Sequence, residues 1–174
     1  MKKYIAPITA ILLLGLVGCS SGETRTPAQN AGQAVEQAPP ERELGHEVAF
    51  GEPAGAAHDD SEFAITATAP QDFAEFSEPP VEGRYVVVDV QAELLGGDGG
   101  AVAATSFMLA DEAGNEYPNA APNGTDMSGM LFATLLSPGS KGSGRVVFDV
   151  PADAGKFTLK YLPIGATEPL ATWH

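Results

Sequence analysis

The stretch Arg84-Tyr85-Val86-Val87-Val88-Asp89-Val90-Gln91 decides the fold class of this chain. Its β-branched residues favour an extended strand. A period of two places alternate residues on opposite faces, so one face carries Val86, Val88 and Val90 and the other carries Tyr85, Val87 and Asp89. The stretch Arg145-Val146-Val147-Phe148-Asp149-Val150 repeats this pattern, with Val146, Phe148 and Val150 directed inward. Two such stretches predict a β-sheet with one buried face.

The same alternation predicts further strands on both sides of this stretch. Apolar residues at positions 63, 65 and 67 alternate with polar or small ones, and so do those at 157, 159 and 161. Shorter strands are expected near residues 47–50, 106–110, 129–135 and 169–173. The last of these contains Trp173, the only tryptophan, which we expect to pack its strand against the core.

Turn-forming segments separate these strands. Gly96–Gly100 is rich in glycine and is expected to be a flexible loop, and Pro138-Gly139-Ser140 presets a bend. No segment shows the 3.6-residue periodicity of an amphipathic helix. We therefore predict an all-β fold, a single antiparallel β-sandwich of about seven or eight strands over residues 46–174.

Residues 1–18 have the organisation of a secretory signal peptide. Two lysines precede the 13-residue apolar segment Ile5–Val17, which is shorter than the roughly 20 residues of a membrane-spanning helix. Leu16-Val17-Gly18-Cys19 then matches a bacterial lipobox. We predict cleavage after Gly18 and lipidation of Cys19, because its thiol can form a thioether with a diacylglycerol. Two or three acyl chains would hold the protein on the outer face of the cell membrane.

Residues 19–45 are rich in Ser, Gly, Pro, Ala, Gln and Glu and contain few large apolar residues. Such a segment buries too little surface to offset the entropy of ordering, so it predicts a disordered acidic tether. Its mean span is roughly 28 Å, which would lift the domain above the lipid headgroups.

The chain carries nine basic and 23 acidic residues, a formal net charge of -14. This balance argues against a nucleic-acid partner, because no basic stripe is available to neutralise phosphates. Cys19 is the only cysteine, so no disulfide can form within the domain. The predicted sandwich must therefore be stabilised by its hydrophobic core, and no cofactor is expected.

Three segments resemble an immunoglobulin-like family, a domain of unknown function of the 4352 type found in lipoproteins of Gram-positive bacteria. The segments are residues 83–90, residues 107–117, and residues 136–151 followed by 157–161. Small secreted mycobacterial antigens share the fold of that family. The resemblance implies an extracellular immunoglobulin-like sandwich, and it implies neither an activity nor functional residues.

Two groups of side chains contain candidate metal ligands. The run His58-Asp59-Asp60-Ser61-Glu62 offers an imidazole and carboxylates, but it has neither an EF-hand pattern nor a second histidine at a useful spacing. Met127 and Met130 could bind Cu(I) through their thioethers, although no His-x-Met sequence accompanies them. We expect no metal site, and the ligands of a weak one would be His58, Asp59, Asp60 and Glu62.

No nucleophile, base and orienting group occur in a recognisable arrangement, so we predict that the protein is not an enzyme. The sequence favours a binding module, displayed at the cell surface, that contacts a protein or another envelope component. Its candidate binding surface is formed by the loops at Gly96–Gly100 and Pro118–Met130. The alternative is an envelope carrier of a metal or small ligand that uses the acidic His58–Glu62 loop or Met127 and Met130. Exposed apolar side chains at one end of the sandwich would favour the first function, and converging ligands in a concave site would favour the second.

Overall fold

The computed structural model describes residues 44–123 and 127–174, and this part of the chain consists mainly of β-strands. The predicted signal peptide, the cleavage site after Gly18, the lipidated Cys19 and most of the tether lie outside the described residues. The described elements, in chain order, are β1 (Glu47–Val48), β2 (Pro53–His58), β3 (Ser61–Ala67), β4 (Gln71–Phe73), β5 (Gly83–Gly97), β6 (Gly100–Ala103), the 3-10 helix η1 (Ala104–Ser106), β7 (Phe107–Ala110), β8 (Glu116–Pro118), the 3-10 helix η2 (Met127–Gly129), β9 (Phe132–Leu135), β10 (Lys141–Pro151), β11 (Thr158–Tyr161) and β12 (Ala171–Trp173). None of the helices in these two ranges is long and apolar enough to span a membrane.

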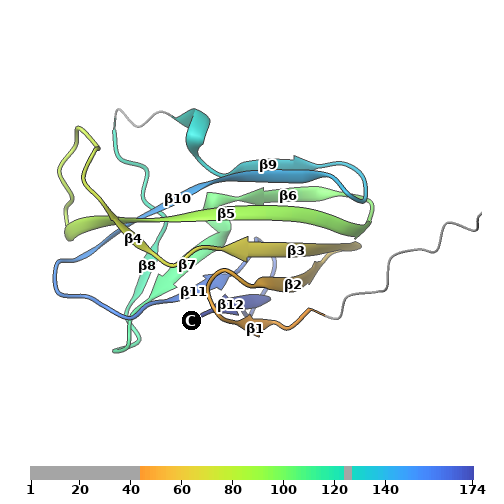
Figure 1. Cartoon of the computed structure of the whole chain (residues 1–174), viewed down its shortest axis with the longest axis horizontal. Helices are drawn as coiled ribbons and strands as arrows, with labels where there is room; N and C mark the ends of the chain where they lie inside the picture. Colours follow the sequence, from red (N-terminus) through yellow and green to blue (C-terminus); the bar gives the residue numbers. More distant parts are fainter. Residues whose placement is uncertain (1–43, 124–126) are drawn as a thin grey trace, which may run out of the picture. The chain divides into compact units, whose positions relative to one another are not determined.

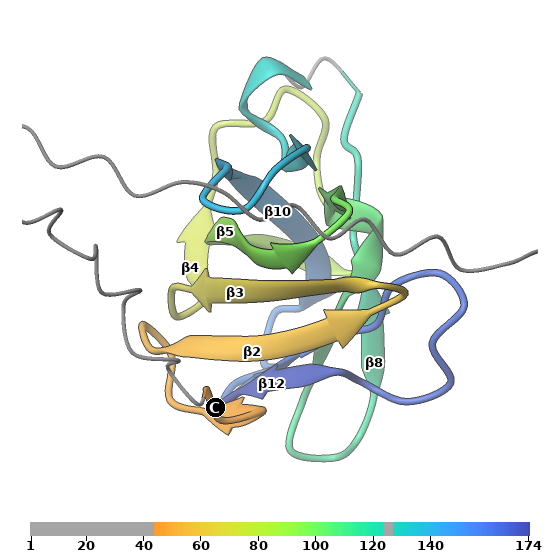
Figure 2. The same ribbon diagram turned by 90° about the vertical axis from the view of Figure 1, so that its right-hand side faces the viewer.

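The strands form a β-sandwich, which confirms the predicted fold class (Figure 1). One sheet has the order β10-β5-β3-β2, with β4 also paired to β5. A second sheet has the order β1-β12-β11-β7-β8, and β6 and β9 form a two-stranded sheet. In Figure 2 β12 lies next to β2, so the two larger sheets meet along this side of the sandwich.

The two valine-rich stretches are paired with each other at the centre of the fold. β5 and β10 run antiparallel, with Val88 opposite Val146 and Val86 opposite Phe148. The side chains predicted to face inward are fully buried, and they belong to one core cluster that also contains Trp173. The packing role predicted for Trp173 is therefore confirmed, and its Nε1 donates a hydrogen bond to the carbonyl oxygen of Glu52 at 3.1 Å.

The opposite face of β5 and β10 is also covered over part of its length. Tyr85, Val87 and Val147 are buried in a second, smaller apolar cluster. Phe73 and Phe76 pack onto this cluster, and the Phe76 and Tyr85 rings meet edge to face with centroids 5.1 Å apart. The segment that follows β3 thus folds back over the sheet.

Residues 44–123 and 127–174 contain twelve strands instead of the predicted seven or eight. Those not predicted are β2, β4, β6 and β8, which are short or rich in alanine, glycine and proline. Their intrinsic strand propensity is low, and they are strands because a longer neighbour supplies the pairing: β2 pairs with β3, β4 with β5, β6 with β9, and β8 with β7. One further difference concerns β1, which pairs in parallel with β12, whereas the other pairs of named strands in the described residues are antiparallel.

The folded domain extends slightly further toward the N-terminus than the predicted boundary at residue 46. The carbonyl oxygen of Gly45 accepts a hydrogen bond of 3.0 Å from the amide of Gly55 in β2. A Cβ atom placed on Gly55 would lie 3.0 Å from the Cβ of Leu44. Leu44 and Gly45, assigned to the tether from the sequence, thus lie against the edge of the sheet.

Candidate functional site

Three turns lie at the same end of the sandwich, namely those between β2 and β3, β5 and β6, and β9 and β10 (Figure 1). The prediction of a flexible loop at Gly96–Gly100 is wrong, because Gly96 and Gly97 end β5 and Gly100 begins β6. Gly97 has φ +92°, and a Cβ atom there would lie 1.9 Å from the carbonyl oxygen of Asp60. Gly97 therefore permits close backbone packing between the β2–β3 and β5–β6 turns, which a residue with a Cβ atom would prevent.

A groove of about 330 Å³ lies beside β6 at this end of the domain. Gly100, Ala101 and Ala103 of β6 line it together with Phe132 of the neighbouring strand β9. Pro163 and Ile164, from the segment between β11 and β12, line it as well. The remaining lining residues come from the β2–β3 turn, the start of β3, the β5–β6 turn and η1: His58, Asp59, Phe63, Gly99, Thr105 and Ser106.

Two large apolar side chains border this groove and are exposed to solvent. Phe132 is 74% exposed and Ile164 is 89% exposed. Phe132 pairs with Ala103, and Thr134 pairs with Ala101. Directly opposite residues of an antiparallel pair point to the same side, so these four side chains share one face of the two-stranded β6–β9 sheet. That face carries no charge, although the chain as a whole is strongly acidic.

The residues considered as metal ligands lie at the β2–β3 turn. His58 and Ser61 are paired across the turn, and Asp59 adopts φ +50°. His58 Nε2 lies 3.6 Å from Asp59 Oδ2, an ion pair when the imidazole is protonated. Within residues 44–123 and 127–174, no group of three or more His, Cys, Asp or Glu side chains is placed to hold a metal ion. The turn therefore does not bring His58, Asp59, Asp60 and Glu62 together as a ligand set.

The two methionines proposed as copper ligands lie in or next to η2. Met127 begins η2, and Met130 follows it. The Met130 side chain is half-buried and packs against both apolar clusters. Met130 therefore contributes to packing, which is the usual role of a methionine in a β-sandwich core.

The described part of the second predicted loop, Pro118–Met130, is attached to the sheet. Asn119 forms a β-bridge with Phe148, and the amide of Ala120 donates a 2.7 Å hydrogen bond to the carbonyl oxygen of Val147. The side-chain amide of Asn123 donates to Glu78 Oε1 at 3.1 Å. Asn119 and Ala120 therefore lie along β10, and Asn123 contacts the segment between β4 and β5. None of these residues lines the groove beside β6.

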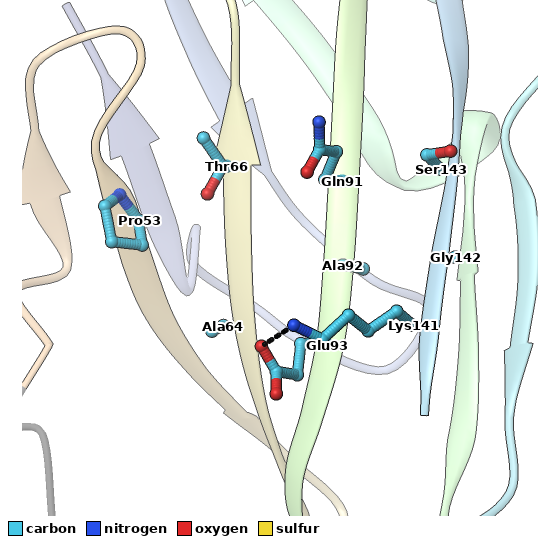
Figure 3. A pocket seen from close by; sticks show the side chains of 9 residues that line it. All are labelled: Pro53, Ala64, Thr66, Gln91, Ala92, Glu93, Lys141, Gly142 and Ser143. Atoms are coloured by element: carbon cyan, nitrogen blue, oxygen red, sulfur yellow. Dashed lines mark ion pairs between the residues drawn. The ribbon is translucent and has the colours of Figure 1, made fainter. Parts of the chain in front are cut away.

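A larger depression, of about 500 Å³, lies on the β10-β5-β3-β2 sheet (Figure 3). Thr66, Gln91 and Ser143 form one row across three strands, and Lys141 Nζ pairs with Glu93 Oε2 at 3.2 Å. The depression arises because neighbouring positions carry only alanine, glycine or proline. Its polar side chains lie on the solvent-exposed face of the sheet, and the charges of Lys141 and Glu93 neutralise each other.

A hydrogen-bonded turn lies between β7 and β8. The Asp111 carboxylate accepts hydrogen bonds from the Tyr117 hydroxyl at 2.8 Å, from the Asn115 side chain at 2.9 Å, and from the amides of Ala113 and Asn115. The side-chain hydrogen bonds from Asn115 and Tyr117 stabilise the charged form and lower the pKa of Asp111 to about 2. The Asp111–Asn115 spacing indicated only a turn, and the contribution of Tyr117 becomes visible only in the folded chain.

Together, the two facing sheets and the short connecting turns define a small immunoglobulin-like β-sandwich domain. The chain belongs to the family described as Domain of unknown function (DUF4352), whose model matches residues 50–169. The resemblance identified from three segments of the sequence is thus confirmed. No curated protein matches the chain in sequence.

Several solved structures share this fold. The secreted protein MPT63 of Mycobacterium tuberculosis is similar with a TM-score of 0.58 at 17% identity, covering 74% of this chain and 95% of that one. The yjhA protein of Bacillus subtilis is similar with a TM-score of 0.52 at 19% identity, covering 68% and 83%. A putative lipoprotein, ycdA, from Bacillus subtilis has a TM-score of 0.50 at 15% identity, covering 68% of this chain and 36% of that one. At these identities the likeness establishes the fold.

Proposed function

We propose that this protein is a lipid-anchored, extracytoplasmic binding module without catalytic activity, which presents the groove beside β6 to a protein partner. The lipobox ending at Cys19 supports the anchor and the location. Two proteins with a similar fold are described as a secreted protein and a putative lipoprotein, which agrees with an extracytoplasmic role.

The observation that carries the proposed binding role is the exposure of Phe132 and Ile164, which both line one groove. Scattered exposed apolar residues are common on protein surfaces, but apolar side chains that border a concavity mark interaction sites. The neighbouring alanines leave space for a partner's side chains. A partner covering this surface would remove both side chains from water, a favourable contribution of about 25 cal/mol per Å² of apolar area.

The alternative, a carrier of a metal or small ligand, has less support. A carrier requires several ligands that converge on one point. The described part of the acidic turn has no such grouping, and Met130 is used in packing. The groove is bordered mainly by apolar side chains, which suits a polypeptide better than an ion.

The anchor and the binding site can be tested separately. In the native host, Cys19→Ser should abolish incorporation of a labelled fatty acid and move the protein from the membrane fraction to the medium. Retention of label by the variant would contradict the anchor.

For the groove, a photo-crosslinking amino acid would replace Phe132 or Ile164 in the anchored protein. The matched control is Val81, which is 86% exposed and lies next to Asp149 near the far end of β10. We expect the same partner to be captured from positions 132 and 164 but not from 81. Equal capture from all three positions, or capture from none, would contradict the groove as the binding site.

A further inference from the structure

The groove lies where the second sheet lacks a strand. β11 pairs with β7 from Thr158 to Tyr161, and the amide of Leu162 extends this ladder by one 2.7 Å hydrogen bond to the carbonyl oxygen of Ser106. The next residue is Pro163, which has no amide hydrogen to donate. The amide of Ala166 then donates to the carbonyl oxygen of Pro163, so the chain turns instead of continuing along β6.

β6 consequently keeps one unpaired edge. In the described part of the chain it is paired only with β9. Alternate residues of a strand direct their N–H and C=O groups to the same edge. Those of β6 that point away from β9 have no strand partner in the described residues, and β6 lines the groove together with Phe132 and Ile164.

We propose that the partner binds by adding an extended segment to this edge of β6, in the place of the missing strand. This inference rests on the proposed binding role of the groove and specifies how the groove would be used. Strand addition provides backbone hydrogen bonds, and pockets for alternate side chains provide selectivity. The segment is about four residues long, because β6 contains Gly100–Ala103 and a strand advances about 3.3 Å per residue.

The charges around the groove indicate the character of the segment. Its two titratable lining residues, His58 and Asp59, lie at the turn beyond the Gly100 end. Asp60 follows Asp59 in sequence, and Asp98 precedes the lining residue Gly99. The opposite end is lined by Thr105, Ser106 and Phe132, which are uncharged. The segment therefore carries alternating apolar side chains and a basic residue at the end that meets Asp59.

The same charges disfavour a second copy of this chain as the occupant. Two β6 edges from different copies would bring two acidic turns to one interface, and each copy carries a formal net charge of -14. Repulsion between like charges opposes such pairing. The partner is thus a different polypeptide with a basic residue next to an extended apolar stretch.

The test uses a defined probe, an acetylated and amidated five-residue peptide in which lysine follows alternating valine and threonine, because a segment that continues the direction of β11 runs antiparallel to β6 and has its C-terminal end next to Gly100 and Asp59. It is titrated to millimolar concentration into the 15N-labelled soluble domain, residues 19–174 with Cys19→Ser. We expect amide shifts concentrated in β6 and at Ile164. Two further peptides carry N-methyl groups on alternate amides. One peptide is methylated at its odd-numbered residues and the other at its even-numbered residues.

Because only alternate amides of an added strand face β6, one N-methylated peptide should lose binding and the other should retain it. Equal binding by both would overturn strand addition while leaving the groove as a binding site. Absence of shifts in β6 with the unmodified peptide would also overturn it, and capture from positions 132 and 164 in cells would then still support the proposed function. Peptide-independent self-association, measured by sedimentation and abolished by Phe132→Ser, would assign the edge to a second copy and overturn the inference.

Asp59→Asn tests the position of the basic residue. Asparagine tolerates the left-handed conformation at this position, so the turn is preserved. The variant should bind the lysine peptide about two- to fivefold more weakly, the range for an exposed ion pair. It should bind a peptide with norleucine in place of lysine as tightly as the parent domain does. Unchanged affinity for the lysine peptide would overturn the assigned orientation of the segment.

Discussion

The hydroxyl group of Ser61 and the backbone of Gly99 form two hydrogen bonds with each other. Ser61 Oγ donates to the carbonyl oxygen of Gly99 at 2.9 Å, and the amide of Gly99 donates to Ser61 Oγ at 3.1 Å. Ser61 is buried, and the two residues are 38 positions apart in the chain. The pair joins the β2–β3 turn to the β5–β6 turn, which both border the groove beside β6.

Ser61→Ala should therefore destabilise the domain by about 1–3 kcal/mol, because two backbone groups of Gly99 lose their partner in a partly buried setting. Urea unfolding of the parent and the variant measures this difference. The control is Ser143→Ala on the exposed face of β10, which should change the free energy of unfolding by less than about 0.5 kcal/mol. Equal effects at the two serines would contradict the structural role of the Ser61–Gly99 pair.

Gly97→Ala should be destabilising by more than about 1 kcal/mol, whereas Gly96→Ala should be neutral or slightly stabilising. A Cβ atom at Gly97 would overlap the carbonyl oxygen of Asp60, and its φ of +92° is strained for alanine. At Gly96 a Cβ atom would meet nothing within 4 Å, and alanine is less flexible than glycine in the unfolded chain. Thermal unfolding of both variants would show whether the adjacent glycines differ in this way.

Phe107→Ala and Phe132→Ala make the same substitution in opposite environments. Phe107 is buried, with its ring centroid 5.1 Å from that of Tyr161, so its loss should cost about 3–5 kcal/mol. Phe132 is largely exposed, so its loss should change stability by less than about 1 kcal/mol. Fluorescence of the single, buried Trp173 can follow unfolding in both variants, since its ring lies 6.4 Å from that of Phe107.

Asp111 should contribute to stability in a pH-dependent way. Its pKa is about 2 in the folded domain, below the ordinary value of 3.8. A lowered carboxyl pKa stabilises the folded state above the unfolded pKa, and this contribution is lost as the pH falls from about 4 through 2. Tyr117→Phe removes one hydrogen bond to the carboxylate, so the pKa of Asp111 should rise. Titration of the Asp111 side-chain carbonyl carbon by NMR measures both values, and an unchanged pKa in Tyr117→Phe would contradict the assigned role of the hydroxyl.

The valine-rich strands were predictable because their burial follows from their own alternation. β2 was not, since Pro53-Ala54-Gly55-Ala56-Ala57-His58 has little strand propensity and is extended through its pairing with β3. Gly96–Gly100 was assigned the wrong role for a related reason. Its composition indicates conformational freedom, whereas the need for glycine is set by residues distant in sequence: Asp60 approaches Gly97, and Leu135 approaches Gly99.

The groove beside β6 could not be inferred from the sequence. Its residues come from positions near 58, 100, 132 and 164, and only the order of strands brings them together. Of the two loops predicted to form a binding surface, the first contributes Gly99 and Gly100 to this groove, whereas the described part of Pro118–Met130 lies elsewhere. Phe132 and Phe107 are both phenylalanines, but Phe107 is buried and Phe132 is exposed. This difference arises from the packing of the folded chain.

The parallel pairing of β1 with β12 has a mechanical consequence. Three backbone hydrogen bonds hold β1 and the residues next to it to the last residues of the chain: from Thr172 to His46, from His174 to Val48, and from Phe50 to His174. A pull on the chain before residue 44 acts along this strand, so it loads the three bonds together in shear instead of breaking them one at a time. A force along β1 is therefore resisted by all three bonds at once and is passed directly to β12.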